Sequence, residues 1–315
     1  MTAQVRARLR GCCWIAYGLA AVAGIYIALR NPATATALQR ISRPSALLLF
    51  AGACVGNTAG LLFGGLSWRE LMAALGSRLP VQTTLRISSI SALSKYVPGP
   101  VWGVLAEVRL SRTSGVSPAR VVTHYMLYLA IVVLAGMAVG LGIAPAALGI
   151  RAVWLALPAV AALGCLLRPD LIGRLVAWAG HLLRRPVPAE VASPGGVRRA
   201  FALEVVAWAI AGLHLWLIAI ALGAPPLRSL MICVAAFSFA AVIGAVVIVV
   251  PDGLGVRELM LVLALRTVMP WQTAVAAAVL SRICCMACEV AMAGGSMALD
   301  HRRMRGLVNA IPEEA

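Results

Sequence analysis

Long apolar runs are the main feature of the hydrophobic pattern along this chain. Leu, Ala, Val and Ile follow one another in these runs, without the segments of about ten alternating residues that are typical of membrane β-strands. A helix needs about 20 apolar residues to cross the hydrocarbon core of a bilayer. Six runs approach or exceed that length: 11–29, 45–66, 118–142, 152–167, 200–222 and 271–299. The pattern therefore predicts an all-α integral membrane protein with six clear spans.

Two further apolar regions, 81–112 and 229–266, are interrupted in the middle by proline and glycine. The interrupting residues are Pro98, Gly99 and Pro100 in the first region, and Pro251, Gly253 and Gly255 in the second. Such breaks are tolerated at membrane depth where the freed backbone groups line a cavity or are covered by protein. We therefore predict two helix-break-helix hairpins, which either re-enter from one side or cross the bilayer fully.

The two breaks resemble each other and lie about half a chain apart. One runs from Val97-Pro98 to Glu107, and the other from Val250-Pro251 to Glu258. If the first hairpin enters from the cytoplasmic side and the second from the outer side, this pattern indicates an inverted repeat with a site between the halves. A chance match, in a chain rich in Val, Gly and Pro, is the alternative.

The composition excludes a water-soluble globule, because 62% of the residues are hydrophobic and only 12% are charged. No polar stretch is long enough for a soluble domain, so we predict one transmembrane domain over 1–315. Within it, 168–199 is predicted to be a cytoplasmic interfacial amphipathic segment. Arginines gather on one side of the predicted spans, which places both termini in the cytoplasm. The long apolar core of 11–29 favours an uncleaved span over a signal peptide.

Lys95 has an unusual place in the sequence. The chain has 27 lysine and arginine residues, and Lys95 is the only lysine among them. It ends a polar stripe of Thr84, Ser88 and Ser91 at helical spacing, which is predicted to face a water-filled groove or a polar ligand. A lysine offers a compact point charge that suits a phosphate oxygen. The alternative is a lysine at headgroup depth that extends toward water.

The second break has the features of an anion site. Gly253 and Gly255 are predicted to let a ligand approach the backbone, the new helix N-terminus presents unpaired N–H groups, and Arg257 adds a positive charge. Glu258 would pair with a nearby cation or carry a proton. The alternative is a structural turn, with Asp252 as the N-cap and an arginine–glutamate pair at the interface.

Arg282, Cys285 and Glu289 share one face of the last apolar run. They fit either a structural ion pair or a role in transport. Cys284 and Cys288 flank them, without a nearby histidine or a second thiol pair at ligand spacing. Helix packing is therefore favoured over a metal site, and no metal or cofactor is predicted.

Polar residues also occur early in two other runs. His124, Tyr125 and Tyr128 begin one of them and are predicted to form an aromatic interface belt. Glu204 lies early in another, at headgroup depth or as a proton carrier. No Walker loop, HExxH or GxSxG motif appears, so the sequence does not predict an enzyme.

Two ordered motifs resemble the paired signatures of the lysylphosphatidylglycerol synthase transmembrane family. They are Lys95-Tyr96-Val97-Pro98-Gly99, followed by Trp102, and the stretch from Pro251 to Glu258, followed by Arg282. This family is the flippase-like membrane domain of the multiple peptide resistance factors, here in a stand-alone form. Asp252 departs from the pattern, because the family usually has glycine there.

The resemblance implies a helical bundle with re-entrant elements that moves a lipid between leaflets of a bacterial or archaeal plasma membrane. The lipid would be of the phosphatidylglycerol type or linked to polyprenyl phosphate. The implied partners are membrane lipids and a separate synthase or glycosyltransferase, with no nucleic acid. The chain resembles the translocating half of the best-known members without their synthesising half.

The resemblance also implies roles for residues at the breaks. Headgroup binding would fall to Lys95, Tyr96, Gly99, Trp102, Gly253, Gly255 and Arg257. Charge balance or proton carriage would fall to Glu258, Arg282 and Glu289, and the helix breaks to Pro98, Pro100 and Pro251.

In this hypothesis Lys95 and Arg257 approach from opposite sides of the membrane and hold the lipid phosphate, while the tails stay in the bilayer. Two other functions stay open at this point. One is a secondary transporter of a small anion or ion, and the other is a non-transporting partner subunit of a cell-envelope glycosyltransferase.

Overall fold

The computed structural model describes residues 43–97, 101–142, 192–246 and 251–309, together with six isolated positions between 157 and 178. These residues form eight α-helices and two short 3-10 helices, and no strand occurs among them. The prediction of an all-α protein is therefore confirmed over this part of the chain.

Five of the helices are long and apolar enough to cross a membrane. They are α3 (Pro44–Ala74), α6 (Pro118–Gly142), α10 (Pro194–Ala221), α11 (Pro226–Val246) and α13 (Trp271–Asn309), the last over Trp271–Asp300. Four of them coincide with predicted runs, and the fifth, α11, is the first half of the predicted second hairpin.

Other predicted elements fall largely outside the described residues. The predicted run 11–29 lies wholly outside them, and 152–167 lies outside them except at isolated positions. The predicted interfacial segment 168–199 is described only in part, and its last residues already belong to α10, which begins at Pro194. Proline suits that first helical position, because its φ is fixed and its missing N–H would have no partner there.

The first hairpin consists of α4 (Val81–Ala92), the 3-10 helix η1 (Leu93–Tyr96) and α5 (Trp102–Arg112). With 12 and 11 residues, α4 and α5 are each shorter than the roughly 20 residues that a crossing needs. Pro98, Gly99 and Pro100, the predicted break, lie outside the described residues.

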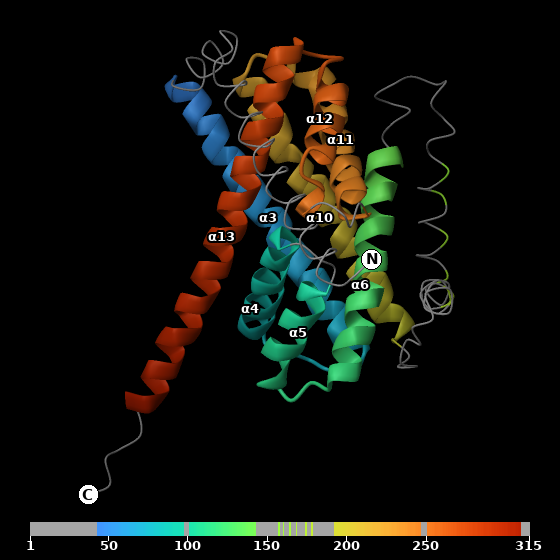
Figure 1. The fold of residues 1–315 in the computed structure, drawn as a ribbon, viewed down its shortest axis with the longest axis vertical. Helices are drawn as coiled ribbons and strands as arrows, with labels where there is room; N and C mark the ends of the chain where they lie inside the picture. Colours follow the sequence, from blue (N-terminus) through green and yellow to red (C-terminus); the bar gives the residue numbers. More distant parts are fainter. Residues whose placement is uncertain are drawn as a thin grey trace, which may run out of the picture.

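The second hairpin consists of α11, the 3-10 helix η3 (Pro251–Gly253) and α12 (Val256–Leu265). It is asymmetric, because α11 has 21 residues and α12 has 10. In Figure 1, α11 and α12 occupy the upper part of the bundle, while α4 and α5 occupy the lower part. The broken ends face each other near the middle, and η1 contacts η3 there.

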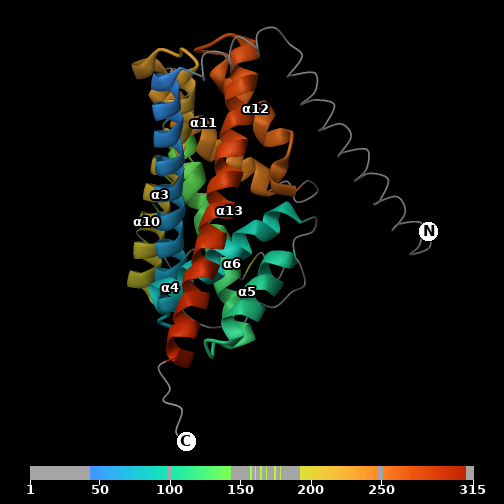
Figure 2. The same cartoon turned by 90° about the vertical axis from the view of Figure 1, so that its left-hand side faces the viewer.

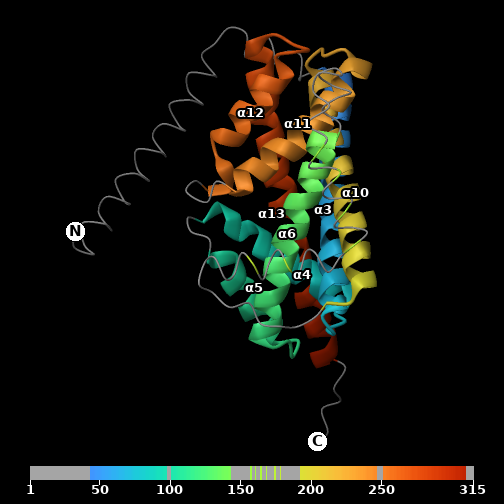
Figure 3. The same cartoon turned by 90° about the vertical axis from the view of Figure 1, so that its right-hand side faces the viewer.

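The helix α13 links the two halves, because it runs along the bundle past both hairpins (Figure 2). It contacts α4 in one half and α12 in the other (Figure 3). The core follows the same division. Ala53, Leu215 and Leu261 belong to a cluster that joins α3, α10 and α12, whereas Leu71 and Ile131 belong to one that joins α3 and α6.

Candidate functional site

Asp252 lies where the two broken hairpins meet, and three cations surround its carboxylate. Its Oδ1 lies 3.7 Å from Lys95 Nζ. Its Oδ2 lies 3.4 Å from Arg257 Nη1 and 2.9 Å from Arg282 Nη1. These cations come from η1, α12 and α13, which are far apart in the sequence. We refer to the six charged residues gathered here as the break cluster: Lys95, Asp252, Arg257, Glu258, Arg282 and Glu289.

Glu289 connects α13 to the first hairpin. Its Oε1 lies 2.6 Å from Lys95 Nζ, and the Tyr96 hydroxyl donates a hydrogen bond of 2.9 Å to its Oε2. The Glu289 side chain is only 6% exposed, whereas the Lys95 side chain is 34% exposed. Of the two side chains in this ion pair, Lys95 is therefore the one that a ligand can reach.

The two arginines of the break cluster are buried and paired differently. Arg282 Nη1 lies 3.2 Å from Glu258 Oε1 and donates a hydrogen bond of 3.1 Å to the Asp252 carbonyl. Arg257 packs its guanidinium 5.0 Å from the centre of the Phe237 ring, a cation–π contact. Arg282 and Glu289, which share a face of α13, thus pair with opposite hairpins.

The backbone at the second break is shaped by packing within the hairpin. Asp252 lies in the left-handed region, at φ 46° and ψ 33°, which is uncommon for a residue other than glycine. Gly253 follows at φ 60°, and a Cβ there would lie 2.2 Å from the Gly244 Cα of α11. The close approach at Gly253 is therefore made by α11 in this structure, and the approach of a ligand there stays a prediction.

The start of α12 also differs from the prediction. Gly255, and not Asp252, is the N-cap, and its N–H donates a hydrogen bond of 2.6 Å to Glu258 Oε2. This N–H is therefore not free to bind an anion, although the sequence predicted free N–H groups at the start of this helix. Glu258, the third residue of α12, instead folds back to accept from the N-cap N–H, which satisfies a donor that the helix leaves unpaired.

The predicted site residues divide into three groups. The first group comes together at the breaks, with Gly253 and Gly255 beside it, and consists of Lys95, Tyr96, Arg257, Glu258, Arg282 and Glu289. Trp102 begins α5 and is 49% exposed. Gly99, Pro98 and Pro100 lie outside the described residues, and Pro251 begins η3.

The polar stripe before the first break does not lie as predicted. Thr84 and Ser91 are buried inside the protein, so a continuous stripe does not face a water-filled groove. Ser91 donates its hydroxyl to the Ile87 carbonyl one turn back. The hydroxyl is thus partly satisfied by its own helix, which is how serine is often accommodated in a helix.

Sequence reasoning missed a group of uncharged polar side chains behind Arg257. Cys285 Sγ lies 3.6 Å from Arg257 Nη2, from Asn57 Oδ1 and from His214 Nε2. His214 Nε2 also lies 2.7 Å from Ser281 Oγ. The signal was present, because Asn57 and His214 are isolated polar residues within apolar runs.

A second buried polar group lies in the other half of the bundle, around Glu107 of α5. Trp68 Nε1 donates a hydrogen bond of 3.1 Å to Glu107 Oε1, and His124 Nδ1 lies 3.5 Å from Glu107 Oε2. His124 is fully buried and its Nε2 lies 3.0 Å from the Trp68 carbonyl oxygen. The prediction that His124 belongs to an interface belt is therefore wrong.

Glu204 of α10 lies near this group. The Tyr128 hydroxyl lies 3.4 Å from Glu204 Oε2 and donates a hydrogen bond of 3.1 Å to the Gly64 carbonyl. Glu204 is buried between helices, so its side chain faces protein and not lipid. Its depth in the membrane and its role as a proton carrier stay predictions. We refer to Trp68, Glu107, His124, Tyr128 and Glu204 as the carboxylate cluster.

The comparison with protein families agrees with the motifs at the breaks. Residues 14–288 match the family model described as the lysylphosphatidylglycerol synthase TM region. Among curated proteins, no individual match was found. The match covers most of the 315 residues and includes both hairpins and the first part of α13, up to residue 288. The chain therefore belongs to the lysylphosphatidylglycerol synthase transmembrane family.

Proposed function

We propose that this protein moves a lipid with a phosphate-containing headgroup between the leaflets of a membrane, as a transporter and not an enzyme. One observation supports this proposal above the others. Cations from both hairpins and from α13 converge on a single carboxylate, Asp252, where the hairpins from opposite ends of the bundle meet. Charged side chains within membrane domains are costly, and they usually mark the path of a polar substrate.

The charges of the break cluster suit the exchange of a carboxylate for a phosphate. The cluster has three basic and three acidic side chains, so its formal charge is balanced when no ligand is bound. A phosphate oxygen that reached Lys95 would compete with Asp252, whose contact to the ammonium is 3.7 Å long. The two arginines lie directly behind Asp252, so a displaced carboxylate would expose further donors to the ligand.

Alternating access follows from the arrangement of the hairpins. Each hairpin belongs to one end of the bundle, and α13 runs between the ends (Figure 3). We interpret this as an inverted repeat, in which rocking of one half against the other opens the break cluster to each leaflet in turn. Glu289 would stay with Lys95 and Tyr96, while Arg257 and Glu258 would move with the second hairpin.

The family supplies the class of lipid. Its description names a synthase of lysylphosphatidylglycerol, so a phosphatidylglycerol-type lipid is the first substrate to test, followed by a polyprenyl-phosphate-linked one. A separate synthase or glycosyltransferase would then provide or consume the lipid. We place the protein in a bacterial or archaeal plasma membrane, with both termini in the cytoplasm.

The proposal is tested in proteoliposomes that contain labelled phosphatidylglycerol and receive a membrane-impermeant quencher. The wild type is expected to make inner-leaflet label accessible faster than empty vesicles do, and Lys95→Ala and Arg257→Ala are expected to abolish most of this gain. Arg199→Ala is the matched control, because its side chain is 65% exposed and lies away from the breaks.

Two results would overturn the proposal. The first is a wild-type rate equal to that of empty vesicles for both phosphatidylglycerol and prenyl-phosphate lipids. The second is a Lys95→Ala rate equal to that of Arg199→Ala. Uptake of a small anion without lipid movement would instead identify a secondary transporter.

A further inference from the structure

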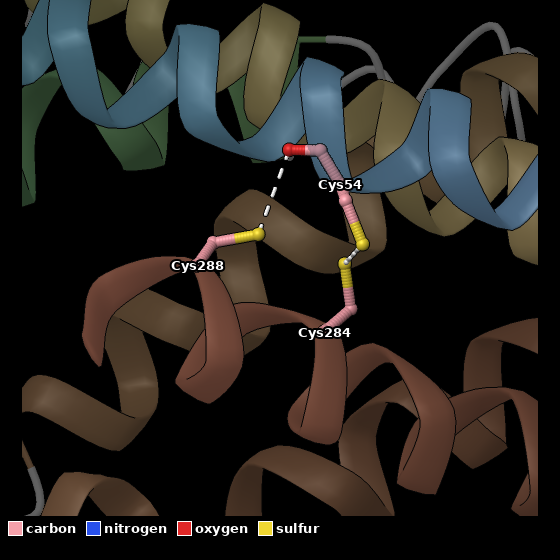
Figure 4. Close-up of side chains that lie close together, drawn as sticks. All are labelled: Cys54, Cys284 and Cys288. Atoms are coloured by element: carbon pink, nitrogen blue, oxygen red, sulfur yellow. Dashed lines mark hydrogen bonds between the residues drawn. The ribbon is translucent and has the colours of Figure 1, made fainter. Parts of the chain in front are cut away.

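Three cysteines from two helices lie together between α3 and α13, apart from the break cluster. Cys54 belongs to α3, and Cys284 and Cys288 lie one turn apart on α13 (Figure 4). Their three Sγ atoms lie within 4.8 Å of one another. All three are free cysteines. The sequence alone predicted packing for the two on α13, because Cys54 is 230 residues away from Cys284.

The contacts among these cysteines already bring the sulfurs toward a common point. Cys54 Sγ lies 3.5 Å from Cys284 Sγ. Cys288 Sγ donates a hydrogen bond of 3.5 Å to the Cys54 carbonyl oxygen, so it lies on the same side of α3. Three sulfurs bound to one metal ion at roughly 2.3 Å must be about 4 Å from each other. The observed spacing is close to this geometry, and small side-chain rotations would complete it.

The three sulfur ligands favour one kind of metal ion over others. Within the described residues, this group consists of three sulfurs alone. The neighbouring Cys285 faces the other way, toward Arg257 and Asn57, and does not supply a fourth sulfur. Structural zinc sites are closed by four ligands, whereas thiolate ligands select copper in its monovalent state. Monovalent copper also needs no fourth donor.

We infer that Cys54, Cys284 and Cys288 form a binding site for monovalent copper. Each thiol that binds the ion as a thiolate releases its proton to solvent, and copper enters and leaves without a change of oxidation state. The site lies at the edge between the two helices, because Cys54 is only partly buried while Cys284 and Cys288 are buried.

A bound ion would join α3 to α13 at the level of the break cluster. Cys284 and Cys288 alternate along α13 with Cys285 and Glu289, and Glu289 pairs with Lys95. Bound copper would therefore restrict the movement of α13, the helix that carries Glu289 of the break cluster. If α13 moves during transport, occupancy of the copper site slows lipid movement. This consequence rests on the proposed function, but copper binding itself does not.

The test is an anaerobic titration of the reduced protein with monovalent copper, in competition with a chromogenic copper chelator. Four other thiols are first removed, so the background variant has serine in place of Cys12, Cys13, Cys165 and Cys233. Cys285 is kept, because it contacts Arg257 and Asn57. In this background we expect one copper ion per chain, a thiolate-to-copper charge-transfer band, and a rise in Tm of about 5 °C at saturation.

Single serine substitutions at Cys54 and Cys288 are expected to weaken copper binding at least about tenfold, because each removes one of three ligands. Cys233→Ser in the otherwise unaltered protein is the matched control, since Cys233 is buried like Cys288 but lies in α11. It is expected to leave the Tm shift unchanged. Elution as a single species in detergent before titration shows that each variant is folded.

Two results would overturn the inference. One is that the background variant takes no copper from the chelator, or takes the same amount after all three cysteines are replaced. The other is that zinc raises the Tm more than copper does at equal concentration, which would identify a different metal. Both results are independent of lipid transport.

Discussion

The break cluster and the carboxylate cluster are both polar and buried in a membrane protein, yet they are built differently. In the break cluster, carboxylates face lysine and arginine from other elements, and Lys95 is 34% exposed. In the carboxylate cluster, Glu107 and Glu204 face a tryptophan, a histidine and a tyrosine, deep between helices. Ion pairs between separate elements suit exchange of partners, whereas hydrogen bonds to fixed rings suit support of a fold.

The contribution of buried charges to stability also distinguishes the two clusters. A buried ion pair seldom stabilises a protein more than well-packed apolar residues would, because each charge has lost its hydration. The concentration of six charges at the breaks therefore needs a reason other than stability, and substrate binding is such a reason. The carboxylate cluster needs none, since its donors and acceptors hold α3, α5 and α6 together.

The largest expected effect is on stability, from Glu107→Ala. The substitution leaves Trp68 Nε1 buried without its acceptor and removes the carboxylate oxygen 3.5 Å from His124 Nδ1, which together cost about 3 kcal/mol. We expect the Tm in detergent to fall by roughly 6 °C. Glu70→Ala is the control, because its partner Arg199 is 65% exposed, and its Tm is expected to change by less than about 2 °C. Equal shifts for the two variants would show that Glu107 has no supporting role.

The next effect is on transport, from Lys95→Ala. Loss of a charged hydrogen-bond donor to phosphate is worth about 1.5 kcal/mol or more, so the rate of lipid movement should fall at least about tenfold. Glu107→Gln should keep much more of its activity. The proteoliposome assay gives the rate, and a thermal scan gives the Tm. Lys95→Ala should lower the Tm less than Glu107→Ala does, because the Tyr96 hydroxyl still donates to the buried Glu289. A large drop in Tm with normal transport by the folded fraction would make Lys95 a structural residue.

Sequence reasoning reached the break cluster because its members are charged residues in apolar runs. The cost of such charges against lipid predicts that they face protein or water, and helical spacing placed Arg282, Cys285 and Glu289 on one face. The family motifs then paired the two breaks. The match of Glu107 with Glu258 was misleading, however, since Glu107 turns to Trp68 and His124 while Glu258 caps α12.

Other features depend on contacts that spacing along one chain does not encode. Asp252 was noted only as a departure from the family and as a possible N-cap, because nothing local predicts that three cations from separate elements meet there. Cys54 was likewise not connected to Cys284. His124 and Glu204 were placed near the membrane surface from their position at the start of a run, but neighbouring helices cover them.

A smaller effect is expected from Asp252→Asn, which changes the charge of the break cluster and little else. Asparagine tolerates the left-handed conformation at φ 46°, so the turn should remain. Three cations then face two carboxylates, and the affinity for phosphatidylglycerol should rise about threefold to tenfold, with a stronger dependence on salt.

Fluorescence titration with labelled lipid measures this affinity. Asp300→Asn removes the same charge from the pair with Arg86, away from the breaks, and should leave the affinity unchanged. An equal gain in both variants would mean that the overall charge of the protein, and not the break cluster, attracts the lipid.

The smallest effect is expected from Glu204→Gln, which is the sharpest test of the difference between the clusters. The Tyr128 hydroxyl keeps the Gly64 carbonyl as an acceptor, and the amide oxygen of glutamine can replace the carboxylate oxygen. The Tm should therefore change by less than about 2 °C, and lipid movement by less than about twofold. The measurement compares wild type and variant with and without a pH gradient across the proteoliposome. If the wild type responds to the gradient and Glu204→Gln does not, Glu204 carries a proton, and the carboxylate cluster has a part in transport beyond holding the helices together.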